Sequence, residues 1–369
     1  MEALSSSRIA GAAAAIIAVG ASLMGLYYFC LRTSGKCSRQ KKGKGAVIFM
    51  ISGDRSQVGK SSVCLGIIGG LIKAGLAKAK EVGYIKPATQ CEKPTLISKF
   101  CRSKNIDSKP IGPIVYFSGF TRSFLEGKQG TSKDMLELVE KAVSSLSQGK
   151  KFIIVDGVGY PAVGSICGVS NAHIAAALNI PVLLVGKKGV GDAVDSTNLN
   201  KAFFENKGVR VLGSVFNKIP DDGSYYSLGK IKKSVLSYFN QFDPKHKVYG
   251  FIPEITELKN ANSKPTAPSS KERAPGVTKV TLKASDDVRM SPEETKISDV
   301  LISAFDTHVD LKAILSDAAE ASGIDIFSGE LVSDELPQTS SVPSSVKETV
   351  LSREEVEKKA KEDGDDCGG

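Results

Sequence analysis

The chain has 369 residues, 41% of them hydrophobic and 24% charged, with a formal net charge of +9. This length fits one large domain or two ordinary ones, and the composition allows a buried core. The seven cysteines are scattered without CxxC spacing and the three histidines are dispersed, which argues against a disulfide framework and a zinc site and favours a reducing compartment.

The N-terminal segment, residues 1–45, predicts a membrane anchor. Residues 9–31 form an uncharged, apolar run of 23 positions, which at about 1.5 Å per residue crosses a hydrocarbon core of about 30 Å. A cleaved signal peptide would have a shorter apolar core and its basic residues before it, whereas here only Arg8 precedes the run and most of the basic residues follow it. A mitochondrial presequence would be richer in arginine. The positive-inside rule then predicts that the rest of the protein faces the cytosol.

Much of the positive charge lies just after this run, in Arg32, Lys36, Arg39, Lys41, Lys42 and Lys44. Anionic lipid headgroups are the natural partner of a juxtamembrane basic cluster. No recurring pattern of basic and aromatic residues is present, so nucleic acid is not an expected partner.

Residues 46–254 alternate between short apolar runs and helical patterns. Strands are expected at 46–52, 82–87, 151–157, 181–187, 209–219 and 247–253. Helices are expected at 61–76, 132–149, 171–179, 191–208 and 226–242. Apolar strands separated by helices predict a doubly wound α/β domain with a mainly parallel sheet.

The last part of the chain divides into two segments. Residues 255–327 begin as a polar linker and continue, over 297–321, with apolar residues at helical spacing, which predicts one or two helices packed on the main domain. Residues 328–369 lack core-forming residues and end acidic, so disorder is expected there.

The stretch GDRSQVGKSS, residues 53–62, follows the first predicted strand and precedes the first helix of the domain. A phosphate-binding loop occupies this position, although the usual motif has four residues between its first glycine and the Gly-Lys pair and this one has five. Backbone amides at the helix start favour an anion. Lys60 would reach the outer phosphates, and the Ser61 hydroxyl suits a Mg²⁺ ion.

Two further residues stand at the ends of predicted strands. Asp156 ends the run FIIVD, where an acidic residue can hold magnesium, although a turn-capping role is a common alternative. Lys86, in GYIKP, ends the strand after the loop and would face the same crevice as Lys60. Together the two ammonium groups would bracket an anionic acceptor and the terminal phosphate. A second glycine-rich stretch, residues 185–194, is expected to form only a turn and a helix start.

These motifs resemble the dethiobiotin synthetase family and its relatives, the cobyrinic acid amidases and the N-terminal domain of some phosphate acetyltransferases. The family loop has five intervening residues and ends Glu-Val-Gly-Lys-Thr, which QVGKS at 57–61 matches closely. The family motif Gly-Tyr-Lys-Pro resembles GYIKP, with Ile85 inserted. Its Glu-Gly-Ala-Gly-Gly segment resembles DGVGY at 156–160, and its strand ending in Asn-Arg resembles VFNKI, with Asn217 at the asparagine.

The resemblance implies a P-loop NTPase fold over about 46–253 that binds ATP and Mg²⁺. In those synthetases a diamine takes up CO₂ as a carbamate, ATP phosphorylates the carbamate, and a ring closes. By carry-over, Lys60 and Lys86 are the catalytic residues, Ser61 and Asp156 hold the metal, and Asn217 recognises adenine. The residues expected to bind the nucleotide are Gly53, Gln57, Val58, Gly59, Lys60, Ser61, Ser62 and Asn217.

Several departures from the family leave the acceptor, a small carboxylate or carbamate, unidentified. Asp156 is shorter than the family glutamate, and Tyr160 with Pro161 replaces the second glycine of the turn. Asp107 is a weak candidate for a third metal carboxylate. The anchor and the C-terminal segment do not belong to the basic family pattern.

A different class of function remains open. Partition and septum-positioning ATPases of the same superfamily carry a signature lysine five residues before the loop lysine, and Arg55 stands there. An arginine acting across a homodimer would make the protein a nucleotide-dependent switch rather than a ligase; a solvated loop arginine is the simpler alternative. A degenerate domain that binds nucleotide and regulates a partner is a third possibility. NKIPD, at 217–221, also resembles a guanine-reading motif. That motif has one residue between its Asn-Lys pair and its aspartate, whereas here two residues intervene, which favours adenine.

Overall fold

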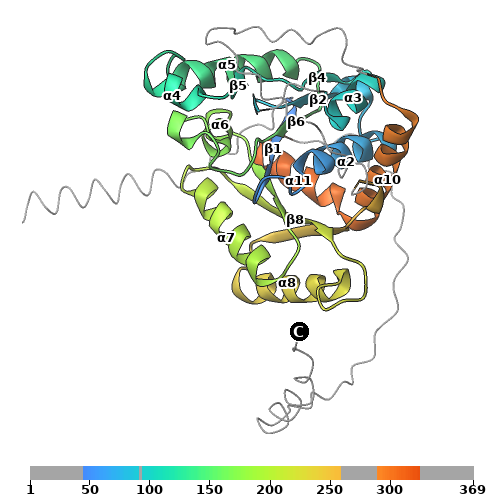
Figure 1. Ribbon diagram of the computed structural model, residues 1–369. Coiled ribbons are helices and arrows are strands. Elements are labelled where there is room, and N and C mark those ends of the chain that lie inside the picture. The colour runs from blue at the N-terminus through green and yellow to red at the C-terminus, as the bar shows by residue number, and fades with distance from the viewer. Residues whose placement is uncertain (1–44, 91–93, 259–288, 325–369) are drawn as a thin grey trace, which may run out of the picture. The chain divides into compact units, whose positions relative to one another are not determined.

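The computed structural model describes residues 45–90, 94–258 and 289–324 (Figure 1). The predicted membrane helix at 9–31 and the predicted disordered tail at 328–369 lie outside these ranges. Among the helices that are described, none has the length and apolar character needed to cross a membrane.

The centre of the fold is a seven-stranded sheet in which every pair of neighbouring strands is parallel. Its order is β4-β2-β6-β1-β7-β8-β9. The strands are β1 (Val47–Gly53), β2 (Val82–Ile85), β4 (Asp107–Lys109), β6 (Phe152–Asp156), β7 (Val182–Gly186), β8 (Val211–Ile219) and β9 (Lys247–Pro253). The predicted α/β domain with a mainly parallel sheet is confirmed.

The register of the central strands brings the predicted motifs to one edge of the sheet. β1 lies between β6 and β7, with Ile51 opposite Asp156 and Gly53 opposite Val185. β2 lies on the other side of β6, with Ile85 opposite Val155. Because the carboxyl ends of parallel strands meet at one edge, the loop after Gly53, Asp156 and the residue after Ile85 become neighbours.

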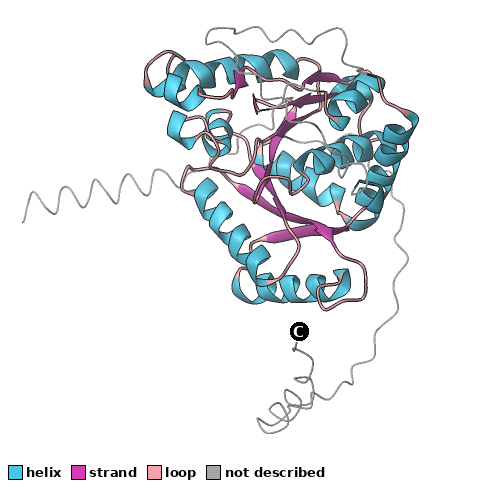
Figure 2. Ribbon diagram, viewed as in Figure 1, coloured by secondary structure: helices cyan, strands magenta, loops and turns pink. Residues whose placement is uncertain are grey.

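Helices cover both faces of the sheet (Figure 2). One layer holds α2 (Lys60–Lys73), α3 (Leu96–Ser103), α10 (Pro292–His308) and α11 (Leu311–Ala321). The other holds α4 (Phe120–Leu125), α5 (Ser132–Ser147), α6 (Asn171–Ala177), α7 (Gly191–Glu205) and α8 (Leu228–Phe242). The elements that remain are β3 (Ala88–Thr89) and β5 (Ile114–Val115), which form a small parallel sheet of their own, and two 3₁₀ turns, Ala79–Glu81 and Ser165–Cys167.

The C-terminal helices belong to the core. Phe305 of α10 is 1% exposed and lies over glycines of α2, where a Cβ added at Gly66 would stand 2.6 Å from its ring. A Cβ at Gly69 would stand 2.3 Å from Ile302. The absence of side chains on this stripe of α2 therefore allows the close approach of α10. Asp317 of α11 accepts hydrogen bonds from Lys247 and Tyr249 of β9, each at 2.7 Å.

Candidate active site

The segment between β1 and α2 is an anion-binding loop in its backbone geometry. Gly59, the residue before α2, has a left-handed backbone with φ 95°, and no side chain caps the first turn of the helix. The first turn also contains no acidic residue. The amides at the start of this 14-residue helix, together with the positive end of its dipole, are thus left to an anionic ligand.

Glycine is required at both ends of the loop. A Cβ on Gly59 would lie 2.3 Å from Asn217 Nδ2, and one on Gly53 would lie 2.5 Å from the side chain of Val58. The Asn217 amide donates to the Val58 carbonyl at 3.0 Å, and Lys218 Nζ donates to the Gln57 carbonyl at 2.7 Å. The end of β8 therefore lies directly against the loop and fixes its shape.

Lys60 is the first residue of α2 and is buried, with 7% of its surface exposed. Its Nζ donates to the Gly159 carbonyl in the loop after β6, at 2.6 Å. Burial lowers the pKa of this ammonium, the charge of Asp156 raises it, and Lys86 lowers it again. The ammonium is thus held between the loop and β6, where an anionic ligand would compensate its desolvation.

Asp156, at the end of β6, accepts hydrogen bonds from residues of the other predicted motifs. Its side chain is fully buried. Its Oδ2 accepts from Ser61 Oγ at 2.8 Å and from Lys86 Nζ at 3.1 Å. The phosphate loop, GYIKP and FIIVD, which are far apart in the sequence, thus meet at a single carboxylate oxygen.

A fourth group, which the sequence did not single out, also reaches this oxygen. Tyr84 OH donates to Asp156 Oδ2 at 2.8 Å. Burial raises the pKa of Tyr84 well above its usual value, and the charge of Asp156 raises it further. The phenol therefore keeps its proton and acts as a donor.

The residues present fit a divalent metal ion. Asp156 Oδ1 is buried and has no hydrogen-bond partner among the described residues, so it remains available as an acceptor. The neighbouring Ser61 hydroxyl supplies a second oxygen. Within the described ranges, no group of three His, Cys, Asp or Glu residues could hold a metal. A site with one carboxylate oxygen and one hydroxyl oxygen matches the Mg²⁺ sites of proteins, in which one or two protein oxygens act with substrate phosphates.

The loop after β6 is held by an asparagine that the sequence analysis also missed. Asn171, the first residue of α6, accepts from the Val158 amide at 3.0 Å and donates to the Val158 carbonyl at 2.9 Å and the Tyr160 carbonyl at 3.2 Å. These bonds fix residues 158–160 and thereby the Gly159 carbonyl that faces Lys60. A Ser170-Asn171 pair at a helix start gives no specific sequence signal for this role.

Arg55, the candidate for action across a dimer, has partners within its own chain. Its Nη2 lies 3.5 Å from Asp192 Oδ1 at the start of α7, and its Nε lies 3.8 Å from Asp54 Oδ1. Lys187 also pairs with Asp192. Burial raises the pKa of the Asp54 carboxyl, against the opposing charge of Arg55. The stretch 185–194, predicted as a turn and helix start, thus leads into α7 and contributes ion pairs beside the loop.

Three further residues that the sequence singled out make no contact with Asp156 that the structure records. Asp107 is exposed at the start of β4, where it pairs with Lys150, whereas Asp156 ends its strand. Tyr160 is 48% exposed, and Ser62 is partly buried on α2. The weak expectation that Asp107 is a metal ligand is therefore wrong, because this residue stands at the opposite end of the sheet.

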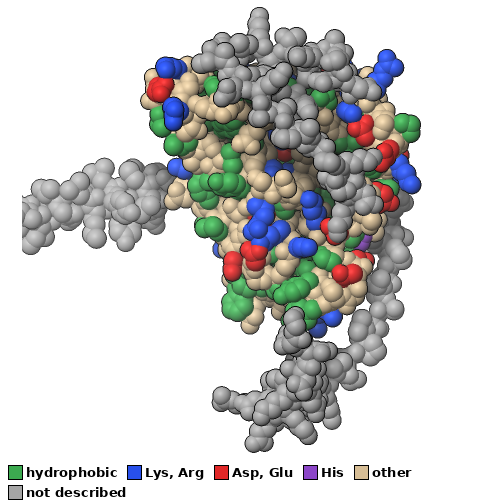
Figure 3. Space-filling view, in the orientation of Figure 1, with side chains coloured by type: hydrophobic (Ala, Val, Ile, Leu, Met, Phe, Trp, Pro, Cys, Tyr) green, Lys and Arg blue, Asp and Glu red, His purple; other side chains and the backbone are tan. Residues whose placement is uncertain are grey.

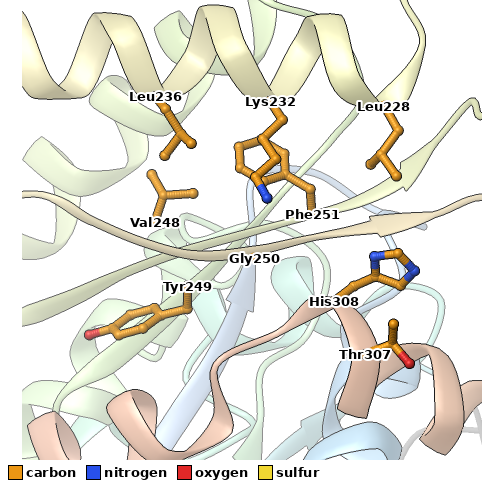
Figure 4. A pocket seen from close by; sticks show the side chains of 9 residues that line it. All are labelled: Leu228, Lys232, Leu236, Val248, Tyr249, Gly250, Phe251, Thr307 and His308. Carbon is orange, nitrogen blue, oxygen red and sulfur yellow. The ribbon is translucent and has the colours of Figure 1, made fainter. Parts of the chain in front are cut away.

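The surface carries a cluster of basic side chains and a separate cavity. Figure 3 shows lysine and arginine side chains gathered near the middle of the viewed face, with acidic residues beside them. A separate cavity of about 200 Å³ lies between α8, β9 and the end of α10, where Lys232 and His308 accompany apolar side chains (Figure 4). None of the residues that line this cavity is a predicted site residue.

The sequence of this chain matches a known family and is similar to two kinds of enzyme. Residues 48–262, more than half of the chain, match the model of the AAA_26 family, described as an AAA domain. An ATP-dependent dethiobiotin synthetase BioD from Anaeromyxobacter dehalogenans is 26% identical over 194 residues, which cover 51% of this chain and 84% of that relative. A cobyrinate a,c-diamide synthase from Caldanaerobacter subterraneus is 25% identical over 57% of this chain, but the match spans only 40% of that longer protein.

A solved structure also aligns, at low similarity. It is a putative plasmid partition protein from Borrelia burgdorferi bound to AMPPNP, with 16% identity, a TM-score of 0.39 and coverage of 71% of this chain and 98% of that chain.

Proposed function

The chain belongs to the AAA_26 family of AAA domains, and from this premise we propose that it binds Mg-ATP and transfers the terminal phosphoryl group to a carboxylate or carbamate of a small acceptor. The observation that carries the proposal is the convergence of Ser61 and Lys86 on Asp156 Oδ2, with Lys60 beside them. The similarity to dethiobiotin synthetase BioD supports the reaction class.

Each side chain has a distinct task in this proposal. Lys60 and the amides at the start of α2 neutralise the outer phosphates. Ser61 and Asp156 hold the metal ion, which would draw charge from the transferring group when bound. Lys86 orients the anionic acceptor, because its ammonium lies on the same carboxylate as the metal-binding serine.

The arrangement of Arg55 favours the ligase over the switch. To act on the nucleotide of a partner subunit, the Arg55 side chain would have to extend away from its own subunit. Here it is paired with Asp54 and Asp192 of the same chain. The exposed pair with Asp192 contributes little, whereas the pair with Asp54 involves a buried carboxylate, and together they favour a role for Arg55 within its own chain.

The test compares Lys86→Ala with Arg55→Ala in the purified protein. A ligase should lose acceptor-dependent ADP release in Lys86→Ala, by about 100-fold, while ATP affinity changes little because Lys60 and the loop amides remain. Its rate per molecule should not depend on protein concentration. ATPase activity that rises with concentration, is lost in Arg55→Ala and is unchanged in Lys86→Ala would establish a dimeric switch instead.

We also propose that residues 9–31 anchor the protein in a membrane with residues 46–254 on the cytosolic side. The uncharged run and the basic residues after it support this topology. Protease added to the cytosolic face of intact vesicles should degrade the domain; protection until detergent is added would reverse the orientation.

A further inference from the structure

The two oxygens of Asp156 have unequal surroundings. Oδ2 accepts from three donors, Ser61 Oγ at 2.8 Å, Tyr84 OH at 2.8 Å and Lys86 Nζ at 3.1 Å. Oδ1 is equally buried but has no hydrogen-bond partner among the described residues. A buried carboxylate oxygen without a partner is costly, so its retention calls for a ligand.

Tyr84 differs from the other two donors in what it can do during the reaction. Ser61 and Lys86 have tasks toward the metal and the acceptor, and their side chains are partly accessible. The Tyr84 ring is 1% exposed on β2, which pairs with β6 so that Tyr84 lies opposite Ile154. Its position is therefore set by the sheet, and its hydroxyl is a fixed, uncharged donor.

On the basis of the proposed Mg-ATP binding, we propose that Tyr84 is a positioning residue for the metal site. Its hydroxyl occupies Asp156 Oδ2 and holds the carboxylate in one orientation, which leaves Oδ1 to the metal ion or to a water molecule on that ion. In GYIKP, Tyr84 thus positions the carboxylate that holds the metal ion, while Lys86 orients the acceptor.

Tyr84→Phe removes the hydroxyl and keeps the ring in the core. In the full-length protein with AMPPNP, Mn²⁺ affinity measured from the free-ion electron paramagnetic resonance signal should fall about 10-fold, the lower end of the effect of losing an outer-shell partner. Affinity for AMPPNP in the presence of a chelator should stay within about 2-fold of the parent, because the loop and Lys60 are unchanged.

Tyr249→Phe is the matched control. Tyr249 is likewise buried and donates to a carboxylate, Asp317 Oδ2, at 2.7 Å, but it lies on β9 among the C-terminal helices. Its removal should leave Mn²⁺ affinity unchanged. Unaltered Mn²⁺ affinity in Tyr84→Phe, or an equal loss in Tyr249→Phe, would overturn the positioning role. A parent protein that binds neither AMPPNP nor Mn²⁺ with it would instead overturn the proposed function and this inference together.

Discussion

A side chain at Gly59 would meet two separate obstacles, the left-handed backbone and the Asn217 amide. Its φ of 95° is strained for any residue with a Cβ, and that Cβ would lie 2.3 Å from Asn217 Nδ2. The position thus couples the phosphate loop to the end of β8, where Asn217 is expected to meet the base.

We predict that Gly59→Ala destabilises the protein more than Gly75→Ala. Gly75 also has a left-handed backbone, with φ 69°, but a Cβ there meets nothing within 4 Å. Backbone strain of about 1 kcal/mol applies to both variants, and the collision at residue 59 adds about 1 to 3 kcal/mol. Urea unfolding measures the difference. Equal losses of unfolding free energy would show that Asn217 moves aside without cost.

At the residue scale, the motifs predicted the members of the site but not all of their contacts. Lys60, Ser61, Lys86 and Asp156 were recognisable because each stands at the end of a strand or the start of a helix. Tyr84 and Asn171 were not, because a tyrosine in a buried strand and an asparagine at a helix start have many ordinary roles. Only the pairing of β2 with β6 brings the Tyr84 hydroxyl to Asp156.

At the scale of elements, the buried strands could be predicted from the sequence, whereas the short and exposed elements could not. The expected strands were found near their predicted bounds, because strands buried on both faces are continuous apolar runs. The edge strand β4 was missed, since its sequence is Asp-Ser-Lys and it spans three residues. The two-residue strands β3 and β5 and the short helices α3 and α4 give too few periods to be recognised.

The packing of α10 on α2 is predicted to contribute strongly to stability. Phe305→Ala should cost about 3 to 5 kcal/mol of unfolding free energy, because the ring is 1% exposed and its loss leaves a cavity over Gly66. Phe242→Ala is the control, since that ring is 68% exposed at the end of α8 and should cost no more than about 0.5 kcal/mol. Similar unfolding midpoints for the two variants would contradict a core role for α10.

At the scale of the whole molecule, α10 and α11 complete one layer of the domain although they follow a long segment that is not described. Asp317 receives hydrogen bonds from Lys247 and Tyr249, so α11 is tied to the edge strand β9. The P-loop helix α2 therefore shares one face of the sheet with α10 and α11, and α10 packs against its glycine stripe. The predicted helices at 297–321 were recognisable from their periodicity, but their contact with the glycine stripe of α2 was not.

The central claim is that this domain binds Mg-nucleotide through Lys60, and calorimetry tests it most directly. AMPPNP with Mg²⁺ should bind the parent with one site per chain, and Lys60→Ala should bind at least about 10-fold more weakly, because it removes the charge nearest the outer phosphates. Circular dichroism should show that both proteins are folded. Equal affinity in the folded parent and the folded Lys60→Ala variant would contradict the nucleotide site described for this protein.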